Sequence, residues 1–68
     1  MMNKFAERLK DLREEKKLSQ RTLAKELKVS QAAIARWENN LQTPNIDVAI
    51  IVAKYFNVTT DYLLGLED

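Results

Sequence analysis

Apolar side chains recur every three or four residues in five stretches of the chain, and this spacing predicts five short helices. We expect them at residues 4–16, 20–27, 31–39, 46–56 and 60–64. Residues suited to an N-cap precede these stretches, namely Asn3, Ser19, Ser30, Asn45 and either Thr59 or Thr60. No long unstructured gap separates the helices, so we predict one compact all-α bundle spanning residues 1–68.

The expected core takes one apolar face from each of the first four helices. The assigned residues are Phe5, Leu9 and Leu12; Leu23, Ala24 and Leu27; Ala33, Ile34 and Trp37; and Ile46, Ala49, Ile50, Ala53 and Phe56. Leu18 and Val29 are expected to pack against the helices next to them, since each is apolar and directly precedes a serine N-cap.

The middle of the chain holds two of these helices with almost no connection between them. Ser19 and Ser30 each stand where a hydroxyl accepts an amide proton that a first helical turn leaves unpaired. Lys28 lies in the intervening turn, where a left-handed backbone is expected and lysine costs roughly 1 kcal/mol. Two short helices joined by a tight turn form a helix-turn-helix, whose second helix can enter the DNA major groove.

The 46–56 helix carries a second apolar stripe opposite its core face. Val48, Ile51 and Tyr55 form this stripe, with Val52 at its edge. A chain of this size cannot bury both faces of one helix internally. Together with two residues near the C-terminus, the stripe predicts an isologous patch for a twofold homodimer: Val48, Ile51, Val52, Tyr55, Tyr62 and Leu66. The alternative is a further domain, outside this sequence, that covers the same stripe.

Composition excludes several classes of function. The sequence contains neither cysteine nor histidine, which removes disulfides, thiolate metal sites and the commonest general base. It also lacks an Asp/Asn/Gly-rich loop that would cage a cation. No convergent carboxylate pair is apparent, so we expect no enzyme activity, no metal and no cofactor. Without an apolar N-terminal run or membrane span, the default expectation is a cytoplasmic protein with no membrane partner.

Charge is unevenly distributed although the net charge is only +1. Residues 1–43 contain ten Lys and Arg against six Asp and Glu, a balance of +4, and residues 44–68 have a balance of −3. This asymmetry indicates a molecule with one face toward a polyanion, the alternative being a chance distribution.

The stretch LSQRTLAKELKVSQAAIARWENNLQTPNIDVAIIVAKYFNVTTDYLLG resembles the Cro/C1-type helix-turn-helix family of phage-repressor and XRE-like bacterial regulators. The resemblance rests on S-Q-x-x-L-A, on V-S-x-x-x-I-x-x-W-E, on a proline seven residues after the tryptophan, and on N-V-x-x-D-Y-L-L-G. It implies a lambda-repressor-like bundle in which the second and third helices form the DNA-binding unit. Lys28 and Asn40 stand where the family commonly has glycine, and the third helix is rich in alanine.

Four residues of the third helix are candidates for base contacts. Gln31 occupies a first helical position, where a side-chain amide suits a phosphate oxygen or a base edge; the resemblance assigns it to a base, for which adenine is the geometric match. Arg36 suits guanine or a phosphate, and we favour guanine. Ala32 and Ala35 either meet thymine methyl groups or act as spacers. The alternative for Gln31 is a plain surface polar residue.

Contacts to the DNA backbone are expected from the start of the second helix and from the loop after the third. The candidates are Gln20, Arg21, Asn39, Asn40, Gln42 and Thr43. Gln20 and the loop residues come from the resemblance, and Arg21 adds electrostatic attraction. The alternative is that they are ordinary surface polar residues.

The resemblance also pairs an arginine of the first helix with the glutamate after the tryptophan. Arg13 and Glu38 stand at these positions, and a partly buried ion pair between them would tie the first helix to the third. The alternative is two unrelated surface charges.

These features lead to two hypotheses of function. The first is a sequence-specific double-stranded DNA-binding transcriptional regulator, a repressor that binds a palindromic operator as a homodimer. The second is a protein-interaction module with the same fold. Its partner would be an antirepressor, a polymerase subunit, or a toxin for which this chain is the antitoxin.

Overall fold

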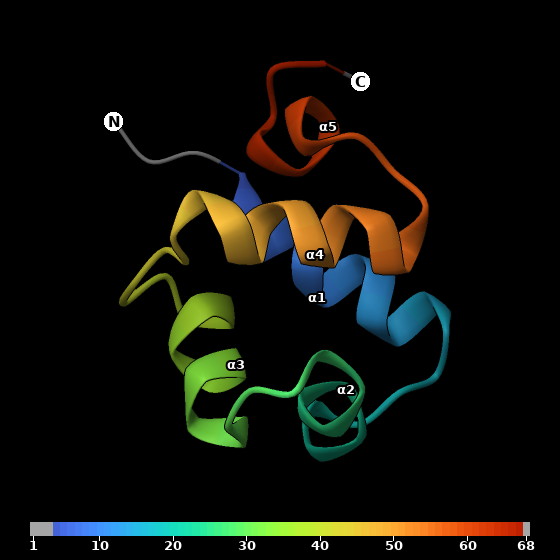
Figure 1. Cartoon of the computed structure of the whole chain (residues 1–68), viewed down its shortest axis with the longest axis vertical. Coiled ribbons are helices and arrows are strands. Elements are labelled where there is room, and N and C mark those ends of the chain that lie inside the picture. The colour runs from blue at the N-terminus through green and yellow to red at the C-terminus, as the bar shows by residue number, and fades with distance from the viewer. Residues whose placement is uncertain (1–3, 68) are drawn as a thin grey trace.

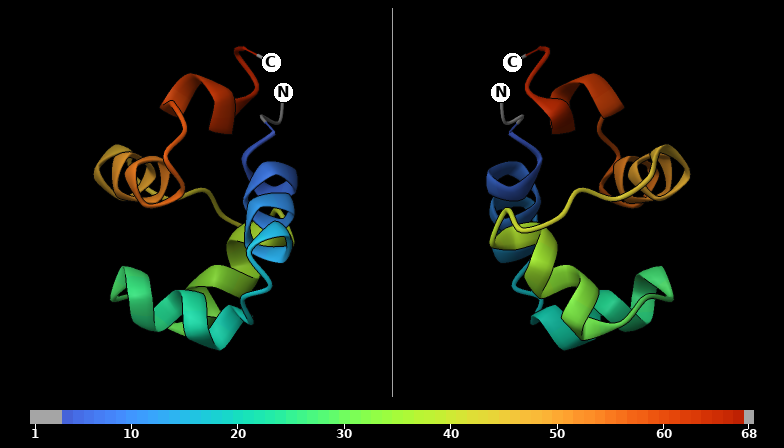
Figure 2. Two further views of the ribbon diagram at one scale, coloured as in Figure 1. Left: turned by 90° about the vertical axis from the view of Figure 1, so that its right-hand side faces the viewer. Right: turned by 90° about the vertical axis from the view of Figure 1, so that its left-hand side faces the viewer.

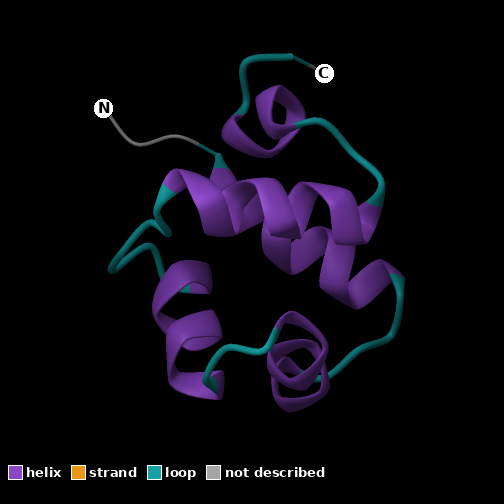
Figure 3. Ribbon diagram, in the orientation of Figure 1, coloured by secondary structure: helices purple, strands orange, loops and turns teal. Residues whose placement is uncertain are grey.

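The computed structural model describes residues 4–67, and all regular structure in this range is helical. The helices are α1 (Phe5–Glu15), α2 (Gln20–Leu27), α3 (Gln31–Glu38), α4 (Ile46–Phe56) and α5 (Thr60–Leu64) (Figure 3). The predicted bounds of α2, α4 and α5 are confirmed. Helix α1 is one residue shorter at each end than predicted, and α3 ends one residue earlier.

Helices α1 and α4 lie across from each other, with α5 at one end of the molecule and α2 and α3 at the other (Figures 1 and 2). Helix α2 packs against α3 and α4, whereas α1 packs against α3 and α5. The two helices of the helix-turn-helix therefore share one end of the bundle. Within residues 4–67, no helix has both the length and the apolar character that crossing a bilayer requires.

Four helices begin with a side-chain cap of the predicted kind. Ser19, Ser30, Asn45 and Thr59 each accept a hydrogen bond from the backbone N–H three residues later, at 2.9–3.0 Å. Such a cap contributes about 1 kcal/mol to helix stability. The predicted cap of the first helix, Asn3, lies outside the described residues.

Every helix ends in the same type of turn. A residue with positive φ follows the helix, and the next residue, always apolar, donates its N–H to the carbonyl five residues earlier at 2.8–3.1 Å. The positive-φ residues are Lys17, Lys28, Asn40, Asn57 and Gly65, and the apolar residues are Leu18, Val29, Leu41, Val58 and Leu66. This is the Schellman arrangement, which satisfies carbonyl groups at the helix end. The left-handed backbone predicted at Lys28 is confirmed, with φ at 61°.

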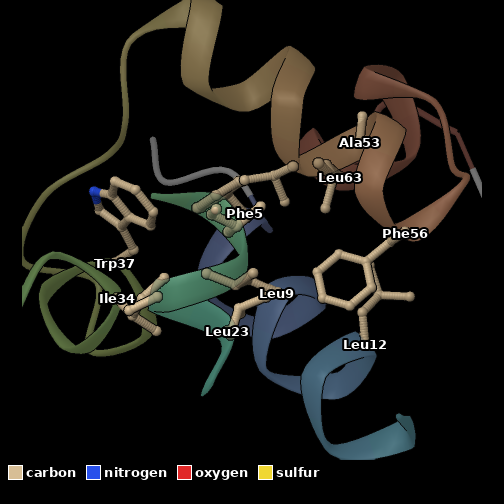
Figure 4. Close-up of a cluster of buried hydrophobic side chains, with 12 residues drawn as sticks. Phe5, Leu9, Leu12, Leu23, Ile34, Trp37, Ala53, Phe56 and Leu63 are labelled. Atoms are coloured by element: carbon tan, nitrogen blue, oxygen red, sulfur yellow. The ribbon is translucent and has the colours of Figure 1, made fainter. Parts of the chain in front are cut away.

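The core lies between the five helices and contains only apolar side chains among those described (Figure 4). Its largest members that are almost completely buried are Phe5, Leu9, Leu23, Ile34, Leu63 and Val52. Phe5 and Trp37 meet edge to face with ring centroids 6.2 Å apart, which joins α1 to α3. The predicted core faces of α1 and α2, and Ile34 and Trp37 of α3, are confirmed.

The predicted faces of α4 are partly wrong. Ile46 and Ile50, assigned to the core, are 74% and 39% exposed, whereas Val52, assigned to the edge of the surface stripe, is completely buried. The core face of α4 consists of Ala49, Val52, Ala53 and Phe56. Because α4 is apolar on nearly all sides, its periodicity alone does not identify the buried face.

Candidate nucleic-acid interface

Helix α3 presents to solvent one face that carries Gln31 and Arg36, and presents an apolar face to the core. Ile34 and Trp37 are at most 6% exposed and point into the bundle (Figure 4). On the other side Gln31, Ala32 and Arg36 are exposed, and Ala35 is half-buried. The outward orientation expected for this helix is therefore present.

The first turn of α3 is fixed by its cap. The Ser30 hydroxyl accepts a hydrogen bond from the Ala33 N–H at 3.0 Å, so that Gln31 becomes the first helical residue. A helix N-terminus carries partial positive charge and N–H groups that the helix itself does not use. The exposed Gln31 amide is thus located where an anionic or polar partner is favoured.

Two candidate residues contact each other, which sequence reasoning missed. The Arg36 Nε donates a hydrogen bond to the Gln42 Oε1 at 3.0 Å. The loop after α3 turns back toward the helix because Asn40 has positive φ and the Leu41 N–H bonds to the Arg36 carbonyl. This bond engages Nε and not the two Nη groups, which a guanine contact can use.

The remaining candidates for backbone contacts lie on the surface. Arg21, Asn39, Asn40 and Thr43 are all exposed. Arg21 belongs to the first turn of α2, whereas the other three follow α3. Candidates for backbone contacts therefore stand both before and after α3 in the sequence.

The predicted ion pair between α1 and α3 is confirmed. Arg13 Nε lies 2.7 Å from Glu38 Oε2, and Arg13 Nη2 donates to Glu38 Oε1 at 3.0 Å. Arg13 Nη1 also donates to the Leu18 carbonyl at 2.8 Å. The hydrogen bond with Glu38 raises the pKa of Arg13, against the opposing effect of burial.

Gln20 belongs to the same network, although the resemblance implied only a contact to the DNA backbone for it. Its Nε2 donates to Glu38 Oε1 at 3.0 Å, so the start of α2 is joined to the end of α3. Glu38 therefore accepts hydrogen bonds from α1 and α2. An amide Nε2 has two protons, and this bond uses one of them.

The residues predicted for the dimer patch do not all lie on the surface. Besides the buried Val52, half-buried Val48, Tyr55 and Tyr62 pack against the core. Only Ile51 and Leu66 are exposed, at 50% and 73%. The assignment of Val52 to a surface patch is therefore wrong, whereas the dimer interface itself stays a prediction.

Charged residues lie beside both tyrosines of the predicted patch. The Arg8 guanidinium lies over the Tyr62 ring at 4.1 Å, and its Nη1 donates to the Tyr62 carbonyl at 3.0 Å. Partial burial, followed by the negative charge of Glu26, raises the pKa of Tyr55 above its ordinary value of 10.0.

Comparison with known proteins identifies the family. A family model described as helix-turn-helix matches residues 9–63, which is most of the chain. The chain belongs to the helix-turn-helix family. Its motifs make it a Cro/C1-type member, as the resemblance implied.

Among curated relatives of this helix-turn-helix protein are two transcriptional regulators. The HTH-type transcriptional activator BcrR of Enterococcus faecalis is 42% identical over 64 residues, which are 94% of this chain and 31% of BcrR. The HTH-type transcriptional regulator YobD of Bacillus subtilis (strain 168) is 31% identical over 94% of this chain and 57% of YobD. The chain thus spans about one third to just over half the length of these relatives.

Solved structures of helix-turn-helix regulators have the same five-helix fold. The P22 c2 repressor protein, determined in complex with synthetic operator 9T, superposes with a TM-score of 0.85 at 32% identity, over 93% of this chain and 96% of that one. A transcriptional regulator from Listeria innocua gives a TM-score of 0.89 at 29% identity, over 100% of this chain and 64% of that one. The predicted fold class is therefore confirmed.

Proposed function

We propose that this chain binds double-stranded DNA in a sequence-specific manner in the cytoplasm, with α3 in the major groove. The observation that carries the proposal is the exposed face of α3, with Gln31 and Arg36 outward and Ile34 and Trp37 holding the helix from behind. Gln31 pairs with adenine and Arg36 with guanine, the matches that side-chain geometry favours.

Contacts to phosphate supply most of the affinity in this proposal. The proposed contacts come from the first turn of α2 and from the segment that follows α3: Gln20, Arg21, Asn39, Asn40, Gln42 and Thr43. Polar side chains of this kind fix the register of a protein on the duplex and carry no sequence information themselves. The P22 c2 repressor, which has the same fold, was determined in complex with an operator, and this supports a duplex as the partner.

The proposed mode of action is repression by a homodimer on a palindromic operator. Two recognition helices about 34 Å apart would enter successive major grooves on one face of the duplex. Because BcrR is named an activator, the direction of regulation needs its own test. We expect a reporter gene to be silenced when the selected site overlaps its promoter; an increase in expression would contradict repression.

The central experiment selects bound duplexes from a random-sequence pool and then titrates the best site and a scrambled duplex at several salt concentrations. We expect a palindromic site bound at least a hundredfold more tightly than the scrambled duplex. The Gln31→Ala/Arg36→Ala variant should lose most of this ratio, whereas the exposed α1 variant Lys10→Ala should keep it. Equal affinity for both duplexes would refute sequence specificity.

A second candidate function is a protein-interaction module. It is favoured by the exposed apolar side chains of Leu41, Ile46 and Ile51, which are 50–74% exposed, and by the alanine-rich α3. In that case the partner would be an antirepressor, a toxin or a polymerase subunit. The Gln31→Ala/Arg36→Ala variant separates the two functions, because an interaction module would keep its partner.

A further inference from the structure

We propose that the outward face of α4 is a self-complementary surface that binds α4 of a second copy in antiparallel orientation. This inference rests on the homodimer of the proposed function and specifies its contact. Of the large apolar side chains that are exposed within residues 4–67, three belong to α4: Ile46, Ile50 and Ile51, at 74%, 39% and 50%. Figure 2 shows α4 on the side of the bundle opposite α1.

Two opposite charges lie on this same face. Asp47 and Lys54 are both exposed, and neither forms a salt bridge within the described chain, where the one pair is Arg13–Glu38. They are seven residues apart, which on a helix is two turns and about 10 Å. Both charges therefore project from one side of α4, near its two ends.

The spacing of Asp47, Ile50, Ile51 and Lys54 is symmetric about a point near the middle of the helix. The midpoint between Asp47 and Lys54 falls between Ile50 and Ile51. At 100° per residue, the two charges lie on the central line of the face, with one isoleucine on each side of it. Reversing the helix direction therefore exchanges positive for negative and leaves the apolar centre in place.

An antiparallel second copy matches this pattern. Asp47 then faces Lys54 of the second copy, and this ion pair occurs twice, once on each side of the twofold axis. Ile50 and Ile51 each pack against the same residue of the second copy near the axis. A parallel copy would place Asp47 against Asp47 and Lys54 against Lys54, and such like-charge contacts are unfavourable. Charge complementarity thus selects the antiparallel twofold arrangement.

The position of α4 in the bundle agrees with this axis. Helix α4 runs across the molecule, between the end that holds α5 and the end that holds α2 and α3 (Figure 1). A twofold axis perpendicular to α4 and along the length of the molecule keeps both α2–α3 pairs at the same end. Both α3 helices are then available to one duplex.

The contact is small, because one face of an eleven-residue helix buries less than a standard interface of about 1,200–2,000 Å². We therefore expect a weak dimer in solution. Two half-sites on one duplex would raise the effective concentration of the copies and promote the contact on DNA.

A charge swap tests the inference without DNA. Asp47→Lys and Lys54→Asp each replace two ion pairs of the dimer by two like-charge pairs, and we expect each to weaken self-association about tenfold in sedimentation equilibrium up to about 1 mM. The double variant Asp47→Lys/Lys54→Asp restores the pairs and should associate like the unmodified chain. Asp11→Lys, the same change on exposed α1, is the matched control and should leave association unchanged.

Several results would overturn the inference. They are a monomeric unmodified chain over the whole concentration range, single variants that associate normally, and a double variant as weak as either single one. As a second measurement, Ile51→Cys should form a disulfide-linked dimer on mild oxidation and Asp11→Cys should not, since the chain has no other cysteine. Equal cross-linking of both variants would also contradict it.

The DNA-binding proposal is tested separately. Asp47→Lys should bind an isolated half-site with unchanged specificity and lose cooperative binding to the palindrome. If neither the unmodified chain nor Asp47→Lys bound the selected site more tightly than a scrambled duplex, the proposed function would be refuted. The result on self-association would not be affected.

Discussion

Glu38 is the residue on which most polar contacts between helices depend. Its carboxylate accepts hydrogen bonds from Arg13 and Gln20 while its side chain is only 3% exposed. Removing one partner of a buried pair leaves an uncompensated charge, which costs more than the pair itself contributes. The orientation of α3 relative to α1 and α2 therefore depends on one side chain.

We predict that Glu38→Ala lowers the free energy of unfolding by about 3 kcal/mol. This value is at the lower end of the range for breaking a buried ion pair, because the Arg13 side chain is 12% exposed. In a domain of this size, that loss is a large part of the total stability. Glu38→Gln retains a hydrogen-bond acceptor and should lose less. Urea denaturation monitored by Trp37 fluorescence measures both; Glu15→Ala on exposed α1 is the control. A loss below about 1 kcal/mol for Glu38→Ala would contradict the prediction.

The raised pKa of Arg13 also fixes how this stabilisation depends on pH. A group whose pKa is higher in the folded state stabilises fully below its ordinary pKa, and the effect disappears as pH rises through the raised value. For arginine this window is strongly alkaline. The contribution of Arg13 to stability is therefore expected to stay constant between pH 6 and about pH 9.

Lys28 holds a left-handed backbone that glycine would adopt without steric cost. We predict that Lys28→Gly raises the free energy of unfolding by about 1 kcal/mol, with a similar gain for Lys17→Gly, whose φ is 58°. Lys25→Gly, inside α2, should lose about 1 kcal/mol and serves as the control. Thermal and urea denaturation give these values, and a destabilised Lys28→Gly variant would contradict the assigned strain.

At the scale of helices, the sequence predicted where elements begin and end better than which faces they bury. Serine, asparagine and threonine caps act within three residues, so their effect is visible in the local sequence. The buried face of α4 depends instead on which neighbours cover it. Ile46 and Ile50 are as apolar as the buried residues of α4. The hydrophobic periodicity therefore could not distinguish exposed from buried positions on this helix.

Long polar side chains were the other feature that local patterns did not reveal. Gln20 meets Glu38 across eighteen residues, and Arg8 meets the Tyr62 carbonyl across fifty-four. Such contacts follow from how helices pack and from no sequence spacing. The Arg13–Glu38 pair was predicted because the resemblance to the family supplied it, and not because the residues alone did.

The start of α3 offers a prediction at this scale. Ser30→Ala removes the hydroxyl acceptor for the Ala33 N–H, which keeps only the Ser30 carbonyl, and should lower the free energy of unfolding by about 1 kcal/mol. It should also speed hydrogen exchange at Ala33 and reduce discrimination at the base that Gln31 contacts. Ser30→Thr keeps a hydroxyl and is the matched control. Unchanged exchange at Ala33 would show that the cap does not hold the first turn.

For the whole molecule, binding of a specific duplex should be visible as added stability. A ligand at a hundred times its dissociation constant stabilises the folded state by about 2.7 kcal/mol. In a domain of 68 residues this corresponds to a rise in Tm of about 10 °C or more. Differential scanning calorimetry with the selected duplex measures the rise. A scrambled duplex at the same concentration should give much less, and equal shifts would argue against specificity.

The Schellman turn that closes each helix has a consequence for how fast the chain folds. Because a two-residue turn closes each helix, connections of only three to seven residues join successive helices, and most contacts in the bundle are local even though α1 also packs against the distant α5. Helical proteins with such low contact order fold within microseconds to milliseconds. Trp37, the single tryptophan, is buried between α3 and α1 and reports this step directly. After a temperature jump its fluorescence should relax in one phase faster than about 1 ms, whereas relaxation over seconds would mean that assembly of the bundle is limited by something other than these local reversals.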